Sequence, residues 1–235
     1  MSPFLGEFIG TALLIIMGAG VVANVVLSKT KGQNSGWIVI TFGWAMAVFL
    51  GVYASNKLGG SGHLNPAVSI GLAAFGDFDP SLLVTYLAAQ FSGAFTGAVI
   101  AWLSYKQHFD ETADKDLKLA VFSTGPAIRN PLYNLFTEII GTFILLFGAL
   151  NISKSAATLG ALDALPVALL VLGIGLSLGG PTGYAINPAR DLGPRIAHFI
   201  LPIKGKRDSD WGYAWIPVIG PIIGALIAAF LYQQL

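Results

Sequence analysis

The sequence predicts an all-α membrane protein with six transmembrane helices and two re-entrant half-helices, arranged as an inverted repeat. Three observations support this prediction. Of the 235 residues, 54% are hydrophobic and only 11% are charged, whereas about a quarter of the residues in a soluble domain are charged. Six apolar stretches come close to the length of about 20 residues that a membrane-spanning helix needs. In addition, the two halves of the chain share landmarks in the same order.

The composition excludes several classes of function. Lys and Arg number 13 against 12 Asp and Glu, so the net charge of +1 provides no basic field for nucleic acid. Without cysteine, the chain has no disulfide, no thiolate metal site and no cysteine nucleophile. The sequence contains no P-loop, dinucleotide fingerprint or nucleophile elbow. We therefore expect no cofactor, no metal and no enzymatic activity.

The apolar stretches predict the individual helices. The six predicted spans are 4–27, 37–54, 81–105, 132–152, 166–178 and 214–232. The fifth span is short, although apolar residues before Pro166 would lengthen it. Two further apolar stretches, 66–75 and 188–200, are too short to cross a membrane, and each begins with Pro, which suits the first position of a helix. We predict that these two stretches are half-helices.

Polar connections separate the predicted helices, at 28–36, 76–80, 106–131, 153–163 and 203–211. The basic residues on one side are Lys29, Lys31, Lys106, Lys115, Lys118, Arg129, Lys204, Lys206 and Arg207, against Lys57 and Lys154 on the other. By the positive-inside rule, both termini would lie outside the cell. A charge run with His108 lies in the connection 106–131, and we expect it to be a solvated face rather than a metal site.

The halves of the chain repeat each other, in a first repeat at 4–105 and a second at 132–232 of a single domain, 1–235. The matching landmarks are Glu7 with Glu138, Asn65-Pro66-Ala67 with Asn187-Pro188-Ala189, and the glycines at 93 and 97 with those at 220 and 224. Each repeat holds three spans, so the second copy enters the membrane from the opposite face. Broken helices at matching places of an inverted repeat mark the site of passage.

The two Asn-Pro-Ala turns predict a central pore. Half-helices that enter from opposite faces meet at their N-termini, where unpaired N–H groups carry a partial positive charge that repels cations. Asn65 and Asn187 would then face each other, and each amide would donate a hydrogen bond to a passing oxygen. The predicted residues of the central pore are Asn65, Pro66, Ala67, Asn187, Pro188 and Ala189.

The backbone that leads into each turn is also expected to line the pore. Irregular backbone at membrane depth is tolerated only where it lines a cavity, so its carbonyls should form a row of acceptors. The predicted acceptors are the carbonyls of Ser61, Gly62, His63, Gly183, Tyr184 and Ala185. The His63 side chain is interpreted as a neutral part of the pore wall rather than a pH-sensitive gate. Central donors and a wall of acceptors suit water or a polyol.

The segments 62–68 and 183–195, each built around an Asn-Pro-Ala box, resemble the major intrinsic protein (aquaporin) family. Asp191 directly after Arg190, Arg195 four residues later, and a Pro-Val pair at 217–218 are similar to the aquaglyceroporin branch, which includes the bacterial glycerol facilitators. The resemblance covers nearly the whole chain. It implies an aquaporin-like fold.

The resemblance also implies a selectivity filter, formed by Trp44, Gly175, Tyr184 and Arg190. Trp44 and Tyr184 would offer an apolar corner to the CH groups of a polyol, while Arg190 would donate hydrogen bonds to its hydroxyls. Gly175 would leave room for the carbon backbone of the solute. Tyr184 stands where Phe is more familiar in the family and adds a hydroxyl.

Three acidic residues are expected to support the re-entrant loops. In the family, glutamates such as Glu7 and Glu138 are buried acceptors that brace these loops, although a proton relay is an alternative. Asp191 is expected to pair with Arg195 or to cap the second half-helix. Arg190 should face the cavity, because a charge within the membrane costs about 2.5–3.5 kcal/mol on insertion scales.

The sequence therefore predicts a passive channel for glycerol, with water and other small neutral solutes. The same pore design would also serve water alone, urea, dihydroxyacetone, hydrogen peroxide or protonated lactic acid. A secondary transporter, which can share inverted repeats and broken helices, is less favoured, as is a scaffold that keeps only the fold. The resemblance implies a homotetramer in the lipid bilayer of a bacterial inner (plasma) membrane, with cytoplasmic termini, contrary to the charge asymmetry.

Overall fold

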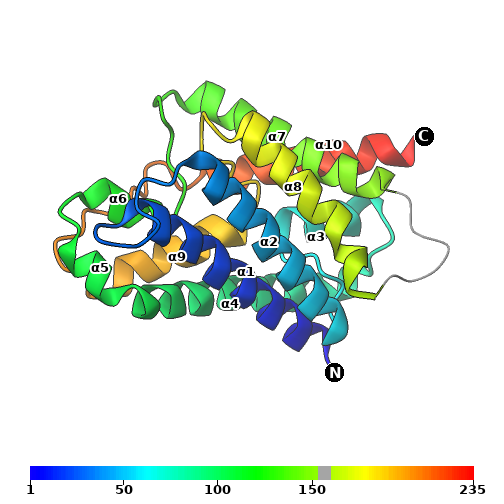
Figure 1. Cartoon of the computed structure of the whole chain (residues 1–235). Coiled ribbons are helices and arrows are strands. Elements are labelled where there is room, and N and C mark those ends of the chain that lie inside the picture. The colour runs from blue at the N-terminus through cyan, green and yellow to red at the C-terminus, as the bar shows by residue number, and fades with distance from the viewer. Residues whose placement is uncertain (153–159) are drawn as a thin grey trace.

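The computed structural model describes residues 1–152 and 160–235, and no strand occurs within these ranges. Long helices lie side by side, and the short helices α5 (Lys106–Glu111) and α6 (Lys115–Ala120) sit at one end of the bundle (Figure 1). Both chain termini lie toward the opposite end. This placement agrees with an even number of spans.

All six predicted spans are helical. The five helices that are long and apolar enough to cross a membrane are α1 (Pro3–Val26), α2 (Trp37–Lys57), η1 with α4 (Pro80–Leu82, Leu83–Ser104), α7 (Pro131–Asn151) and α10 (Ile216–Gln233). The remaining span is α8 (Leu165–Leu178), which follows the 3-10 helix η2 (Gly160–Ala164). The largest difference is at the end of α2, predicted at 54 and observed at Lys57. Residues 153–159 of the predicted connection 153–163, with Lys154, lie outside the described residues.

The two half-helices have the predicted bounds, α3 at Pro66–Phe75 and α9 at Pro188–Ile200. Each follows an extended Asn whose side-chain oxygen accepts a hydrogen bond from the first turn, at 3.0 Å from Ala67 N in α3 and 3.0 Å from Ala189 N in α9. Such N-caps stabilise a helix by about 1 kcal/mol each. Asn and Pro together therefore fix where each half-helix begins.

Helices of the two halves pack in matching ways. α1 contacts α2 and α4, while α7 contacts α8 and α10. The half-helices are exchanged between the halves, because α3 packs mainly on α10 and α9 mainly on α4 (Figure 1). This exchange brings both Asn-Pro-Ala turns to the middle of the molecule.

Glycines allow the long helices to approach closely, as small residues do in membrane proteins. A Cβ on Gly97 of α4 would lie 2.5 Å from the carbonyl oxygen of Ala12 in α1. A Cβ on Gly224 of α10 would overlap the carbonyl oxygen of Ile139 in α7. The matching glycines of the two repeats therefore serve the same helix contact in each half.

The connection 106–131 is more ordered than the polar loop that the sequence predicts. Helices α5 and α6 form within it, and the buried rings of Phe109 and Phe122 lie 5.6 Å apart. Even Lys118 is buried, and its ammonium donates a hydrogen bond to the carbonyl of Lys204. The acidic residues of the charge run, Glu111, Asp114 and Asp116, are exposed as the sequence predicts, whereas the two short helices and the apolar residues that fold the connection onto the core were missed. Among residues 1–152 and 160–235, no cluster of His, Asp and Glu is placed to hold a metal ion.

Adding a methyl group at Gly224 tests the helix contact. We expect Gly224→Ala to lower the free energy of unfolding by about 1–3 kcal/mol, because the added methyl group meets a backbone carbonyl, which cannot move aside as a flexible side chain could. Thermal unfolding in detergent measures this effect. Gly173→Ala is the matched control, since a Cβ at that exposed position of α8 meets nothing within 4 Å. Equal unfolding midpoints for the two variants would contradict the close contact.

Candidate transmembrane pore

The two Asn-Pro-Ala turns meet through a reciprocal pair of hydrogen bonds. Asn65 Nδ2 donates to the carbonyl of Ile186 at 2.7 Å, and Asn187 Nδ2 donates to the carbonyl of Leu64 at 2.8 Å. Each Asn thus binds the residue directly before the other Asn, which the sequence did not reveal. An amide nitrogen carries two N–H groups, so each side chain keeps one donor for a solute.

A cavity of about 380 Å³ runs past both asparagines. Its polar lining comes from both re-entrant segments and includes Ser61, Gly62, His63, Asn65, Tyr184, Ala185, Asn187 and Arg190. Its apolar lining includes Val48, Val52, Leu72, Leu145, Leu150 and Val171. The other predicted residues of the central pore, Pro66, Ala67, Pro188 and Ala189, are buried at the starts of the half-helices and are absent from the described lining.

The predicted row of acceptors consists of carbonyls that the protein leaves free. Within the described ranges, no hydrogen bond reaches the carbonyl oxygens of Ser61, Gly62, His63, Gly183, Tyr184 and Ala185. Five of these residues line the cavity, and Gly183 is the exception. Buried backbone carbonyls are nearly always paired in proteins. Free carbonyls along a cavity therefore indicate acceptors for a solute or water.

Glu7 in α1 braces the first re-entrant segment. Its carboxylate accepts hydrogen bonds from the backbone N–H groups of His63 at 3.1 Å and Leu64 at 2.8 Å. The side chains of Gln90, at 2.8 Å, and Ser55, at 3.0 Å, complete its shell of donors. Leu64 has a positive φ of 51°, which is uncommon outside glycine. The carboxylate therefore holds the backbone in a conformation that it would not adopt alone.

Glu138 in α7 plays the same part in the second segment. It accepts from the N–H groups of Ala185 at 3.0 Å and Ile186 at 2.7 Å, and from the hydroxyl of Thr182 at 2.7 Å. Ile186 repeats the positive φ, at 44°. Neither Glu138 nor Glu7 is among the described residues that line the cavity. The contacts of the two glutamates favour bracing over a proton relay.

Asp191 joins α9 to the connection after α6. It pairs with Arg195 at 2.8 Å and accepts from the N–H and the hydroxyl of Thr124, at 2.8 Å and 2.7 Å. Arg195 in turn donates to the carbonyls of Thr124, at 2.9 Å, and Ser209, at 2.7 Å. Of the two roles expected for Asp191, the structure contains the pair with Arg195, while the N-cap of α9 is Asn187.

Sequence reasoning missed several of these partners. Gln90, Thr182 and Thr124 stand 83, 44 and 67 residues from the carboxylates that they bind. No local spacing links residues so far apart, and hydroxyl and amide side chains are common throughout the chain. Only the packing of the helices brings them together.

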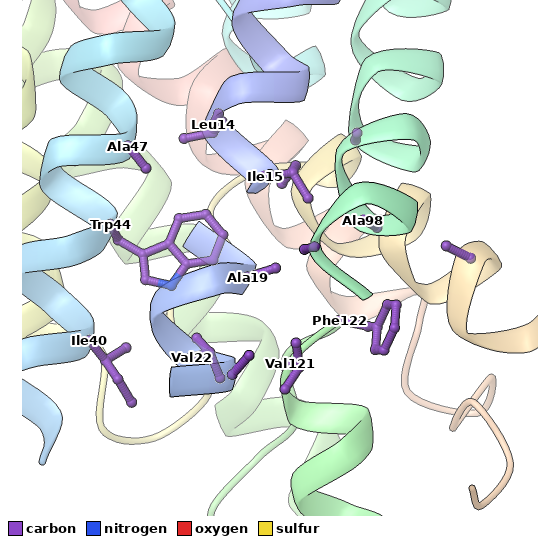
Figure 2. Packing of buried hydrophobic residues seen from close by; sticks show 14 of the residues in the cluster. Leu14, Ile15, Ala19, Val22, Ile40, Trp44, Ala47, Ala98, Val121 and Phe122 are labelled. Carbon is purple, nitrogen blue, oxygen red and sulfur yellow. The ribbon is translucent and has the colours of Figure 1, made fainter. Parts of the chain in front are cut away.

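Three of the four predicted filter residues line one part of the cavity. The guanidinium carbon of Arg190 lies 4.0 Å from the ring centroid of Trp44, a cation–π contact. Figure 2 shows Trp44 reaching from α2 toward α1, among the side chains of a buried apolar cluster. A Cβ on Gly18 of α1 would overlap this ring, so Gly18 makes the space that the indole occupies. Arg190 Nη1 lies 3.4 Å from the carbonyl of Phe122, which leaves most of its donors free.

The sequence predicts that Gly175 leaves room for a solute, but in the structure this space is occupied. A Cβ at this position would lie 2.9 Å from Tyr184 Cζ and 3.1 Å from the Tyr184 hydroxyl. Gly175 is also absent from the described lining of the cavity, whereas Tyr184 belongs to it. The aromatic ring of Tyr184 has therefore taken the space next to Gly175.

The long apolar helices, the two half-helices and the amphipathic cavity between them define a multi-pass membrane protein with a pore. A family model described as "Major intrinsic protein" matches residues 1–232, and the chain belongs to this family. Proteins of this family are channels that catalyse no reaction, so the expectation that the chain is not an enzyme is confirmed.

Several known proteins are similar to the chain over its length. The "Probable glycerol uptake facilitator protein" of Thermotoga maritima is 60% identical and covers 100% of both chains. The glycerol uptake facilitator protein of Bacillus subtilis is 53% identical over 99% of this chain and 84% of its own length. The X-ray structure of the aquaglyceroporin from Plasmodium falciparum matches with a TM-score of 0.87 at 33% identity, over 99% of this chain and 95% of that one. This likeness confirms the predicted fold class.

The pair formed by Asp191 and Arg195 supplies a test of the second re-entrant segment. We expect Asp191→Asn to destabilise the protein by about 3–5 kcal/mol, because it leaves the buried Arg195 without its counter-charge. Thermal unfolding in detergent is the measurement. Glu111→Gln makes the same change in an exposed ion pair with Lys29 and should leave the midpoint unchanged. A similar loss in both variants would argue against a special role for the buried pair.

Proposed function

We propose that the chain is a passive channel that carries glycerol, together with water and other small neutral solutes, down their concentration gradients. The observation that carries this proposal is the amphipathic cavity, whose lining combines free carbonyls and amide donors with aliphatic side chains. A polyol carries both hydroxyls and CH groups, so it matches both kinds of lining. The names of the bacterial relatives, which are glycerol uptake facilitators, support the same solute.

Each group in the pore has a part in passage. The carbonyls of the two re-entrant segments accept hydrogen bonds from a hydroxyl in place of water, while Asn65 and Asn187 donate at the centre. The N-termini of α3 and α9 face the same region, and their partial positive charges repel cations. Trp44 and Tyr184 contact the CH groups, and Arg190 donates to hydroxyls and adds a full positive charge.

A secondary transporter is the second candidate, and the contacts of the glutamates speak against it. A coupled transporter needs groups that bind its driving ion, and Glu7 and Glu138 are the carboxylates buried among the long helices. Glu7 accepts from four donors and Glu138 from three. Carboxylates satisfied in this way are poor ligands for a passing ion.

We assign the channel to a bacterial inner membrane as a homotetramer with cytoplasmic termini, on the strength of the family and its bacterial members. The count of Lys and Arg argues for the opposite orientation by the positive-inside rule, and we give the family more weight than this count. Cross-linking in membranes and protease access to the termini test these assignments.

Stopped-flow light scattering on proteoliposomes tests the function directly. An inward glycerol gradient should shrink the vesicles and then re-swell them much faster than empty vesicles, and dissipation of proton and sodium gradients should leave the rate unchanged. Water flux without re-swelling would indicate a water channel, and urea, dihydroxyacetone, hydrogen peroxide and lactic acid would then be ranked. Uptake that stops without an ion gradient would establish a transporter instead.

The charge of Arg190 supplies a prediction about ion exclusion. We expect Arg190→Ala to raise the leak of small cations by about tenfold or more, because Arg190 lines the cavity and two like unit charges about 4 Å apart repel each other by about 4 kcal/mol at an effective dielectric constant of 20. Glycerol flux should persist. The control is Arg129→Ala, which removes an arginine that pairs with Asp210 in the exposed loops. Equal cation leaks in the two variants would place the ion barrier elsewhere.

A further inference from the structure

We infer that Trp37 sets the range of solutes that the channel admits, by holding the ring of Tyr184 in place. Trp37 is absent from the described lining of the cavity, so its effect would be exerted through Tyr184. It is a positioning residue at the first position of α2. The inference rests on the proposed function, because it concerns the width of the filter.

Trp37 makes two contacts that converge on the filter. Its indole Nε1 donates a hydrogen bond to the carbonyl of Gly175 in α8 at 3.0 Å. Its ring meets the ring of Tyr184 edge to face, with centroids 5.8 Å apart and planes at 80°. One side chain therefore joins α2 to α8 and at the same time touches the aromatic residue that lines the pore.

Gly175 of α8 and Gly179, the residue that follows α8, complete an enclosure around the Tyr184 ring. A Cβ on Gly179 would lie 2.6 Å from Tyr184 Cδ1 and 2.8 Å from Trp37 Cζ2, and a Cβ on Gly175 would lie 2.9 Å from Tyr184 Cζ. Thr41 of α2 is also close, since its methyl group would lie 3.0 Å from the same Cβ on Gly175. The ring of Tyr184 thus fits between α2 and α8. It has space there because residues 175 and 179 are glycines.

The ring of Tyr184 depends on this enclosure for its position. Its hydroxyl is buried and has no hydrogen-bond partner within residues 1–152 and 160–235. Its backbone has a positive φ of 39°, which is uncommon for a residue other than glycine. Because no hydrogen bond fixes the side chain, only the packed walls do so. Removal of Trp37 would open a space on the side away from the cavity, into which the ring could retreat.

A purely structural role for Trp37 would have a different outcome. Trp37 is 41% exposed at the start of a span, where Trp residues often anchor a helix at the membrane interface. Loss of an anchor would lower the amount of folded protein or its stability. It would not change the relative rates at which the folded channel passes solutes of different size.

The test is a double-mutant cycle on purified protein in proteoliposomes, with glycerol and a five-carbon polyol as probes. We expect Trp37→Ala to raise the permeability ratio of five-carbon polyol to glycerol by about two- to tenfold. This range is the free energy of one edge-to-face aromatic contact, expressed as a ratio of rates. In a Tyr184→Ala background, Trp37→Ala should change the ratio no further, because residues that act through each other are not additive. Phe42→Ala, at an exposed aromatic of the same helix, should leave the ratio unchanged.

The outcomes separate this inference from the proposed function. An unchanged ratio in Trp37→Ala, or equal effects of Trp37→Ala with and without Tyr184, would overturn the role of Trp37. Absence of glycerol flux in the unmodified protein would overturn the proposed function instead. If Trp37→Ala does not fold, Trp37→Phe retains an aromatic ring without the hydrogen bond to Gly175, and it should give a smaller rise of the ratio that also disappears in the Tyr184→Ala background.

Discussion

Backbone N–H groups in the middle of a membrane need acceptors within the protein, and two buried carboxylates supply them here. Glu7 and Glu138 each take two consecutive N–H groups of a re-entrant segment. With their N–H groups fixed on the side of the glutamate, these segments keep carbonyls free for the cavity. A charged group at this depth is expensive unless donors surround it. The pore therefore depends on two buried carboxylates and on the backbone N–H groups whose hydrogen bonds stabilise them at this depth.

Two of the predicted filter residues, Arg190 of α9 and Trp44 of α2, lie in the wall of the cavity. Arg190 lies in the first turn of α9, directly before Asp191, whose contacts with Thr124 and Arg195 fix that turn against the loops. Its guanidinium then lies over Trp44, which fits against α1 because residue 18 is glycine. A positively charged donor and an aromatic surface are thus brought together by elements from both halves of the chain.

Features that depend on nearby residues could be predicted from the sequence, and features that depend on distant ones could not. The bounds of α3 and α9 follow from Asn-Pro signals and from length, whereas the bracing role of the glutamates was expected only from the resemblance to the family. The space at Gly175 was misjudged because its occupant, Tyr184, arrives from another segment. Helices α5 and α6 were missed for a similar reason, since Phe109 and Phe122 become buried only against the assembled core. Composition indicates that a residue is small or apolar but not what fills the space beside it.

The reciprocal hydrogen bonds of Asn65 and Asn187 also bear on how the chain is made. Asn187 follows the carbonyl that it binds, that of Leu64, by 123 residues. A ribosome adding about 5–20 residues per second needs on the order of 10 s to synthesise that length. During this interval the first re-entrant segment lacks its partner, and a membrane interior offers no substitute. The insertion machinery must keep this segment hydrated or shielded until the second half arrives, so completion of the pore is a late event in biogenesis.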